Sequence, residues 1–210
     1  MEIARPSSAV VILNINDYST IEDMAKAILK QVEGAFYLGA LSMGGYVAFE
    51  ILRQAPDRVK KLALFNTTAL PDTPEQTKFR LEMIDLAQKI EFSTFFSRLL
   101  PRFLSKTSLQ DQNLVKTVKK MAMEAGKDVY IRHQKAIIGR VDSRPLLPHI
   151  TCPALVIAGE EDVLTPAPAM QEMAQIIPNS EFFQVAQAGH LTPLESPKTL
   201  AKYWKNWINS

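Results

Sequence analysis

The sequence predicts an α/β fold in which a mostly parallel, doubly wound sheet carries a helical insert. Short β-branched apolar runs alternate with segments whose apolar residues recur at the helical period of about 3.6 residues. Strands that alternate with helices are typical of parallel sheets. The alternation stops near residue 70 and resumes near residue 149, with only helical patterns between. We therefore expect an α/β core domain at residues 1–70 and 149–210 and a helical cap, or lid, at residues 71–148.

The first part of the core is predicted to contain three strands and two helices. Thr20 or Ser19 is expected to cap the first helix, since a side-chain oxygen there can accept an amide hydrogen bond from the first turn. The second helix should end before Pro56, because proline disfavours a helical conformation in the residue preceding it. The expected strands are residues 9–15, 35–41 and 59–66, and the expected helices are residues 20–32 and 44–54.

The second part of the core repeats this rhythm after the insert. Thr165 is expected to cap a helix that Pro166 opens, because proline is well suited to the first helical position. The expected strands are residues 154–158 and 181–185, and the expected helices are residues 166–177 and 196–208. Ligands of such sheets bind beyond the carboxyl ends of the strands, so the residues that follow each strand are the candidates for function.

The second strand leads into a serine between small residues, in the run Gly39-Ala40-Leu41-Ser42-Met43-Gly44-Gly45. A serine in a tight strand-to-helix turn is the pattern of a nucleophile elbow, which lifts the hydroxyl above the sheet. The same turn would direct the Met43 backbone N–H at the reacting group. A serine that merely caps the helix, next to glycines that allow close packing, is the structural alternative.

An acidic run follows the strand at residues 154–158. A carboxylate buried against a histidine would fix the histidine tautomer and stabilise its protonated form. Asp162 is the candidate, because its side chain is short and lies closest to the next helix. For Glu160 and Glu161 we favour a solvated acidic loop.

A histidine follows the last predicted strand, in Gly189-His190-Leu191, where its ring can swing over the sheet toward a serine hydroxyl. His133 lies in a helical pattern of the insert and His149 in a proline-bounded connection, so both are expected to be surface or packing residues. The chain order serine, acid, histidine is the order found in α/β-hydrolase triads.

These residues resemble the α/β-hydrolase superfamily, in its lidded, serine-nucleophile, esterase-like branch. The resemblance implies Ser42 as nucleophile, His190 as base, Asp162 as orienting acid and the Met43 N–H as an oxyanion donor. It covers nearly the whole chain from about residue 9. It rests on residues 41–46 (LSMGGY), 156–162 (VIAGEED), 189–197 (GHLTPLESP) and 20–25 (TIEDMA).

Two departures from the family pattern stand out. Ala40 replaces a usual glycine, which adds one methyl group to a tight turn. Members of the family also carry more strands before the elbow, and a loop among them donates a second oxyanion N–H, so the chain is expected to be N-terminally shortened. If strand 9–15 pairs beside strand 35–41, a backbone amide of Asn16, Asp17 or Tyr18 could serve as that donor.

The leading functional hypothesis is a serine hydrolase that cleaves an ester-like bond of a small, largely apolar acyl substrate through an acyl-enzyme. Esters, lactones, thioesters and carbon–carbon bonds beside carbonyls all stay open. Cys152 is the single cysteine, and neither a metal-ligand cluster nor a nucleotide motif is found, so no metal and no cofactor are expected. A catalytically weak or silent binding or interaction protein is the alternative, since one oxyanion donor is worth about 10²–10³ in rate.

Charge and hydropathy exclude other classes of protein. The net charge of +2 gives no footprint for nucleic acid or anionic lipid. No apolar run approaches the roughly 20 residues of a membrane helix, so we expect a cytoplasmic protein without nucleic-acid or membrane partners. A homodimer through an exposed sheet edge is one option. The apolar side chains of the insert would either roof the substrate pocket or pack the lid; they are Phe79, Phe92, Phe95, Phe96 and Phe103.

Overall fold

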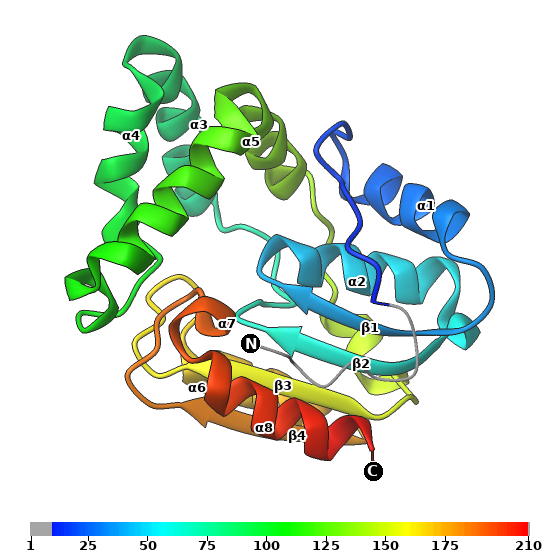
Figure 1. Ribbon diagram of the computed structural model, residues 1–210. Helices are drawn as coiled ribbons and strands as arrows, with labels where there is room; N and C mark the ends of the chain where they lie inside the picture. The colour runs from blue at the N-terminus through cyan, green and yellow to red at the C-terminus, as the bar shows by residue number, and fades with distance from the viewer. Residues whose placement is uncertain (1–9, 210) are drawn as a thin grey trace.

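A parallel sheet forms the centre of the protein. The computed structural model describes residues 10–209, and across these residues the sheet has four strands in the order β1-β2-β3-β4 (Figure 1). Every pair is parallel, so all carboxyl ends meet at one edge. The strands are β1 (Phe36–Leu41), β2 (Val59–Phe65), β3 (Ala154–Gly159) and β4 (Ser180–Val185).

Helices cover both faces of this sheet. Along β3, Val156 packs in a core cluster with α1, α2 and α6, whereas the neighbouring Ile157 packs in a second cluster with α8. This alternation follows from the period of two in a strand, and it explains why β3 is apolar throughout. The core helices are α1 (Ile21–Gln31), α2 (Met43–Gln54), α6 (Ala167–Ile176), α7 (Thr192–Glu195) and α8 (Pro197–Ile208).

The segment between β2 and β3, hereafter the insert, is helical and lies beside the arrowheads of the strands (Figure 1). Its longest helix bends at Gly126, whose φ of 84° lies outside the helical region. The insert helices are α3 (Pro74–Lys89), α4 (Phe92–Leu99) and α5 (Gln112–Ile138). Short 3₁₀ turns occur at Pro56–Arg58, Leu100–Arg102, Ser108–Gln110 and Arg144–His149.

Most predicted element boundaries agree with the structure within one or two residues. Thr20 caps α1 as expected and accepts a hydrogen bond from the Asp23 amide at 3.0 Å. The predicted cap of α6 is wrong, since Pro166 holds the N-cap position. The Thr165 hydroxyl instead donates to Asp162.

The strand predicted at residues 9–15 is also wrong. Ala9 lies outside the described residues, and the described residues 10–15 form no strand. Val10, Val11 and Ile12 are 76%, 62% and 94% exposed, so this apolar run is not buried on two faces. Among the described strands β1 pairs only with β2, and a run without a neighbouring ladder has nothing to satisfy its backbone as a strand.

Hydropathy along the helices bears on membrane crossing. Within residues 10–209, no helix combines the length and the apolar character that a membrane span requires.

Candidate active site

Ser42 occupies the turn between β1 and α2, with the backbone geometry of an elbow. Its φ of 53° and ψ of −118° lie in a region that L-residues rarely adopt. Ser42 holds the N-cap position of α2, yet its side chain makes no capping hydrogen bond. The capping alternative is therefore not how this hydroxyl is used. The hydroxyl contacts His190 instead.

The elbow is held by backbone bonds and close packing. The Ser42 amide donates to Phe65 O at 2.9 Å, which ties the turn to the neighbouring strand. The Thr67 hydroxyl donates to Ser42 O at 2.8 Å. A Cβ at Gly45 would lie 2.2 Å from Thr67 Oγ1, so only glycine fits there. Ala40 is buried and tolerated, because its methyl group faces Gly44, where a Cβ would still be 3.8 Å away.

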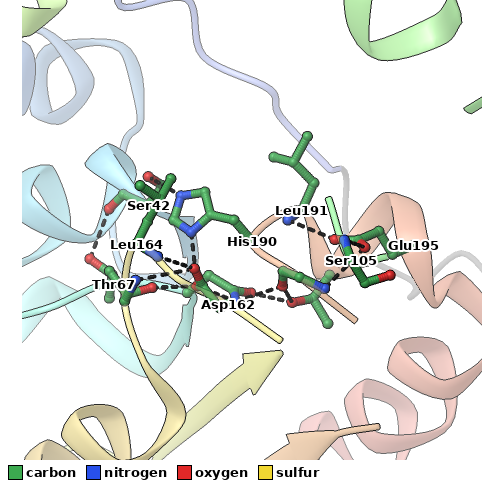
Figure 2. A network of polar contacts seen from close by, with 12 residues as sticks. Ser42, Thr67, Ser105, Asp162, Leu164, His190, Leu191 and Glu195 are labelled. Atoms are coloured by element: carbon green, nitrogen blue, oxygen red, sulfur yellow. Dashed lines mark hydrogen bonds and ion pairs between the residues drawn. The ribbon is translucent and has the colours of Figure 1, made fainter. Parts of the chain in front are cut away.

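His190 brings two of the predicted site residues together, as Figure 2 shows. Its Nε2 lies 2.7 Å from Ser42 Oγ, and its Nδ1 lies 2.9 Å from Asp162 Oδ2. A ring with its proton on Nδ1 satisfies both contacts: it donates to the carboxylate and accepts from the hydroxyl. His190 and Asp162 are buried, whereas Ser42 stays partly exposed.

Asp162 accepts hydrogen bonds on both of its carboxylate oxygens. Oδ1 accepts from the amides of Leu164 and Thr165 at 2.8 and 3.1 Å. Oδ2 accepts from His190, from the Thr165 hydroxyl at 2.5 Å and from Asn66 Nδ2 at 2.8 Å. Burial by itself would raise the pKa of Asp162, but these bonds, with His190 the strongest, outweigh it and lower the pKa below its ordinary value. Asp162 is thereby kept ionised beside the imidazole.

Asn66 is a site residue that the sequence analysis missed. It directly follows β2, has a φ of 45° and is fully buried. Besides Asp162, its Nδ2 group contacts Gly189 O at 3.2 Å, and its Oδ1 accepts from the Thr192 hydroxyl. Asn66 thus joins the acid to the histidine loop. The sequence did contain a signal for this residue: an asparagine stands at the end of a predicted strand, and asparagine tolerates the left-handed region of φ/ψ space better than most residues.

The Met43 backbone N–H is the candidate oxyanion donor. Met43 is the first residue of α2, where a backbone N–H has no partner within the helix. A second donor was expected near the elbow if a strand at residues 9–15 paired beside β1. The described residues 10–15 form no strand and do not pair with β1. The Asn16 amide donates to Asn14 Oδ1 at 2.8 Å, and the Tyr18 amide donates to Ile15 O at 3.4 Å. Two of the three proposed amides are therefore engaged locally.

The other titratable candidates lie outside the Ser42–His190–Asp162 cluster. His133 lies on α5, where burial lowers its pKa, and His149 is exposed. Glu160 is exposed and Glu161 is partly exposed, in keeping with the solvated acidic loop expected for them, and each also binds a backbone amide. Glu160 accepts from the Gln187 amide at 3.0 Å, and Glu161 accepts from the Lys106 amide at 2.9 Å.

The phenylalanines of the insert divide between packing and the site. Phe92 and Phe95 pack with Tyr130 inside the insert, as the packing alternative expects. Phe103 lies at the site, with its ring centroid 5.9 Å from that of His190, and Phe96 stacks on Phe103. An apolar wall beside His190 is therefore formed by this pair.

A cavity of about 570 Å³ opens between α1, α2 and the end of α5. Its wall includes Tyr46, Arg53 and Arg140, and Ser42 is not among its lining residues. Arg140 already bonds Asp72 at 2.6 Å and lies over the Tyr46 ring at 4.5 Å. This cavity has a mixed polar and apolar lining and is separate from the seryl hydroxyl.

Solved structures with the same fold include enzymes that act on esters and lactones. A thermophilic esterase from Thermogutta terrifontis, solved with malate bound, is 31% identical with a TM-score of 0.84, over 91% of this chain and 73% of that chain. The enol-lactonase from Burkholderia xenovorans LB400 is 25% identical with a TM-score of 0.80, over 91% and 74% of the two chains.

Curated relatives are similar over most of this chain and less of their own. The pimeloyl-[acyl-carrier protein] methyl ester esterase of Nitrosomonas europaea is 27% identical over 191 residues, which are 85% of this chain and 73% of that protein. RutD of Yersinia enterocolitica, named for carbamate hydrolysis, is 26% identical over 180 residues. That match covers 81% of this chain and 63% of RutD, so the chain spans less than two thirds of that relative.

Residues 4–197 match the family described as alpha/beta hydrolase fold. The match takes in all four strands, the insert and the loops that carry Ser42, Asp162 and His190. Since it extends over most of the sequence and the sheet is parallel throughout, this chain belongs to the alpha/beta hydrolase family.

Proposed function

We propose that this chain is a cofactor-independent serine hydrolase that cleaves an ester-like bond of a small, largely apolar acyl substrate. One observation carries the proposal. The seryl oxygen lies 2.7 Å from His190 Nε2 while the opposite ring nitrogen lies 2.9 Å from a buried carboxylate. A nucleophile, its base and an orienting acid within hydrogen-bond reach are the arrangement that acyl transfer needs. Relatives named as esterases agree with it.

The proposed reaction has two halves. Ser42 Oγ attacks the acyl carbon while its proton passes to His190 Nε2, and the imidazolium then gives that proton to the leaving alcohol. Water, deprotonated by His190, next attacks the acyl-enzyme, and the proton returns to Ser42 Oγ as the acid leaves. Asp162 orients the ring and stabilises the imidazolium. The Met43 N–H stabilises the negative charge on the carbonyl oxygen.

The insert would act as a cap in this reaction. It lies beside the carboxyl ends of the strands and places Phe103 next to His190. An apolar wall there would favour an acyl group with few polar atoms. Comparing hydrolysis of short-chain and medium-chain p-nitrophenyl esters by wild type and Phe103→Ala tests this assignment. A chain-length preference that is unchanged by the substitution would contradict it.

Labelling by a fluorophosphonate probe tests the function. Wild type should be labelled at Ser42, and Ser42→Ala and His190→Ala should not. Ser97→Ala is the matched control, because Ser97 lies exposed on α4 and its hydroxyl bonds only Ser93 O. Labelling of Ser42→Ala at the wild-type rate would contradict the proposal.

A catalytically silent binding protein is the second candidate, favoured by the local use of the Asn16 and Tyr18 amides. Folded protein that binds apolar esters without hydrolysing them, and that the probe leaves unlabelled, would support this candidate. Any Ser42-dependent turnover would exclude it.

A homodimer through the free side of β1 is a further proposal. Within the described sheet β1 has a neighbour on one side only, and Tyr37 on this strand is 53% exposed. Bare strand edges invite pairing. Sedimentation equilibrium should then give twice the chain mass of 23.5 kDa, and Tyr37→Pro should shift the protein to monomer, since proline removes a ladder donor. A wild-type monomer at high concentration would contradict the proposal.

A further inference from the structure

Glu195 lies at the end of α7, five residues after His190, and its carboxylate is bound by backbone amides. Oε2 accepts from the amides of Gly189 and Ser105 at 3.0 and 2.8 Å. Oε1 accepts from the Leu191 amide at 3.1 Å. Figure 2 shows this group of bonds beside the Ser42–His190–Asp162 cluster. One side chain therefore binds both residues that flank His190 and a residue of the insert.

The same insert segment also bonds His190 directly through the backbone. The amides of His190 and Leu191 both donate to Phe103 O, at 3.1 and 3.2 Å. A Cβ at Gly189 would lie 2.6 Å from Ser105 N and 2.8 Å from Leu104 C, so loop and insert are in close contact. Every amide from residue 189 to residue 191 is thus bonded to Glu195 or to Phe103.

These bonds determine where the imidazole lies. The histidine loop lies between β4 and α7, so it has no strand ladder or helix to fix its path. Hydrogen bonds to a charged acceptor are about twice as strong as neutral ones. Across residues 10–209 no lysine, arginine or histidine forms an ion pair with Glu195. Its carboxylate is therefore directed to the amides and not to a cation.

We infer that Glu195 is a positioning residue: it holds the loop on both sides of His190 so that the ring spans Ser42 and Asp162. The inference rests on the proposed hydrolase function and adds to it a residue that contacts neither substrate nor the reacting atoms. Because a misplacement of about 1 Å can cost about 10²-fold in rate, loss of the three amide bonds should be visible in the chemistry. A purely structural Glu195 would lower stability without moving the ring.

The experiment compares Glu195→Ala and Glu195→Asp with wild type. Aspartate keeps the charge but is one methylene too short to reach all three amides. Glu161→Ala is the matched control, since Glu161 also binds an insert amide, that of Lys106, but none in the histidine loop. The readouts are the second-order rate of fluorophosphonate labelling, the downfield proton resonance of the His190 Nδ1–H bonded to Asp162, and thermal unfolding.

We expect Glu195→Ala to be labelled about 100-fold more slowly and to lose the downfield resonance while staying folded. Glu195→Asp should be intermediate, and Glu161→Ala should keep the resonance and a rate within about threefold of wild type. If Glu195→Ala does not fold, Glu195→Asp decides. A folded variant with wild-type rate and resonance, and only a lower melting temperature, would overturn the inference.

The resonance separates this inference from the proposed function. If wild type is not labelled, the hydrolase proposal fails, yet the spectrum still reports the position of the ring. Loss of the signal in Glu195→Ala, with a weakened or lost signal in Glu195→Asp, would then support positioning by Glu195, and a signal that is unchanged in Glu195→Ala would overturn it.

Discussion

The two sides of the site are held in place by different means. On the nucleophile side, Ser42 is fixed by a strained backbone turn and by close contact between Gly45 and Thr67. On the other side, Asp162 and His190 are fixed by hydrogen bonds among side chains that follow three strands, and by the Phe103 backbone oxygen of the insert, which accepts from the His190 amide. The nucleophile side depends on shape in addition to its backbone hydrogen bonds, whereas the other side depends mainly on polar bonds.

This difference predicts how each side responds to substitution. A turn that depends on shape should fail abruptly when one methyl group is added, whatever its polarity. A network of polar bonds should tolerate the loss of a peripheral bond, because the remaining ones still hold the ring, and should fail outright only when the contact between Asp162 and His190 itself is changed. Substitutions on the two sides of the site test this difference.

The largest effect is expected at Asp162. Asp162→Asn replaces the acceptor for the His190 Nδ1–H with a group that favours the wrong tautomer, so the rate of ester hydrolysis should fall by about 10⁴-fold. Initial rates with a p-nitrophenyl ester measure it, and circular dichroism checks that the variant is folded. A folded variant within tenfold of wild type would show that Asp162 does not orient the base.

Two substitutions at Asn66 separate the stability that its side-chain hydrogen bonds provide from the cost of its left-handed backbone conformation. Asn66→Gly removes the bonds to Asp162, Gly189 and Thr192, at a cost of about 1–3 kcal/mol in the free energy of unfolding. Asn66→Ala should cost about 1–2 kcal/mol more, because its backbone must adopt the left-handed φ of 45°. Urea denaturation measures both values. An alanine variant that is more stable than the glycine variant would contradict this account.

Gly45 tests the side that depends on shape. Gly45→Ala would place its Cβ 2.2 Å from Thr67 Oγ1 and should destabilise the protein by about 1–3 kcal/mol. Gly44→Ala is the matched control one residue earlier, where the nearest atom lies at 3.8 Å. It should be neutral or stabilising, as alanine is the better helix former. Equal melting temperatures for Gly45→Ala and Gly44→Ala would show that the close contact between Gly45 and Thr67 does not limit the size of the side chain.

The smallest effect is the pH dependence of stability that Asp162 contributes. Its folded pKa is lowered from 3.8, so the stabilisation is full above that value and is lost as the pH falls through the folded pKa. Below pH 3.8 the free energy of unfolding of wild type should therefore fall more steeply than that of Asp162→Asn. Chemical denaturation at several acidic pH values measures this. Free energies of unfolding that change equally with pH in the two proteins would contradict the predicted contribution of Asp162.

The sequence was sufficient to place Ser42, Asp162 and His190 at strand ends, because strand periodicity and turn chemistry are local properties. It was insufficient for Asn66 and Glu195, whose partners lie up to 126 and 90 residues away and are set by the packing of loops. The role of Thr165 was missed for the same reason. Its sequence position is typical of a helix cap, but its hydroxyl donates to Asp162 in the folded protein.

The run at residues 10–15 fails for a related reason. Its β-branched residues match those of β3, which lies between β2 and β4 with every side chain buried. An apolar pattern states a preference, but a strand also needs a neighbour to bond, and residues 10–15 have none among the described strands. Pairing is a property of the fold and is not visible in the run itself.

Trapping an acyl-enzyme would show whether Ser42 is the nucleophile. Wild type mixed with p-nitrophenyl acetate, quenched in acid within its first turnovers and digested should yield the peptide that contains Ser42 with one acetyl group added. The His190→Ala protein treated in the same way should yield only the unmodified peptide. Turnover of the ester by folded wild type with no acetyl group on Ser42, or equal turnover by Ser42→Ala, would contradict the account.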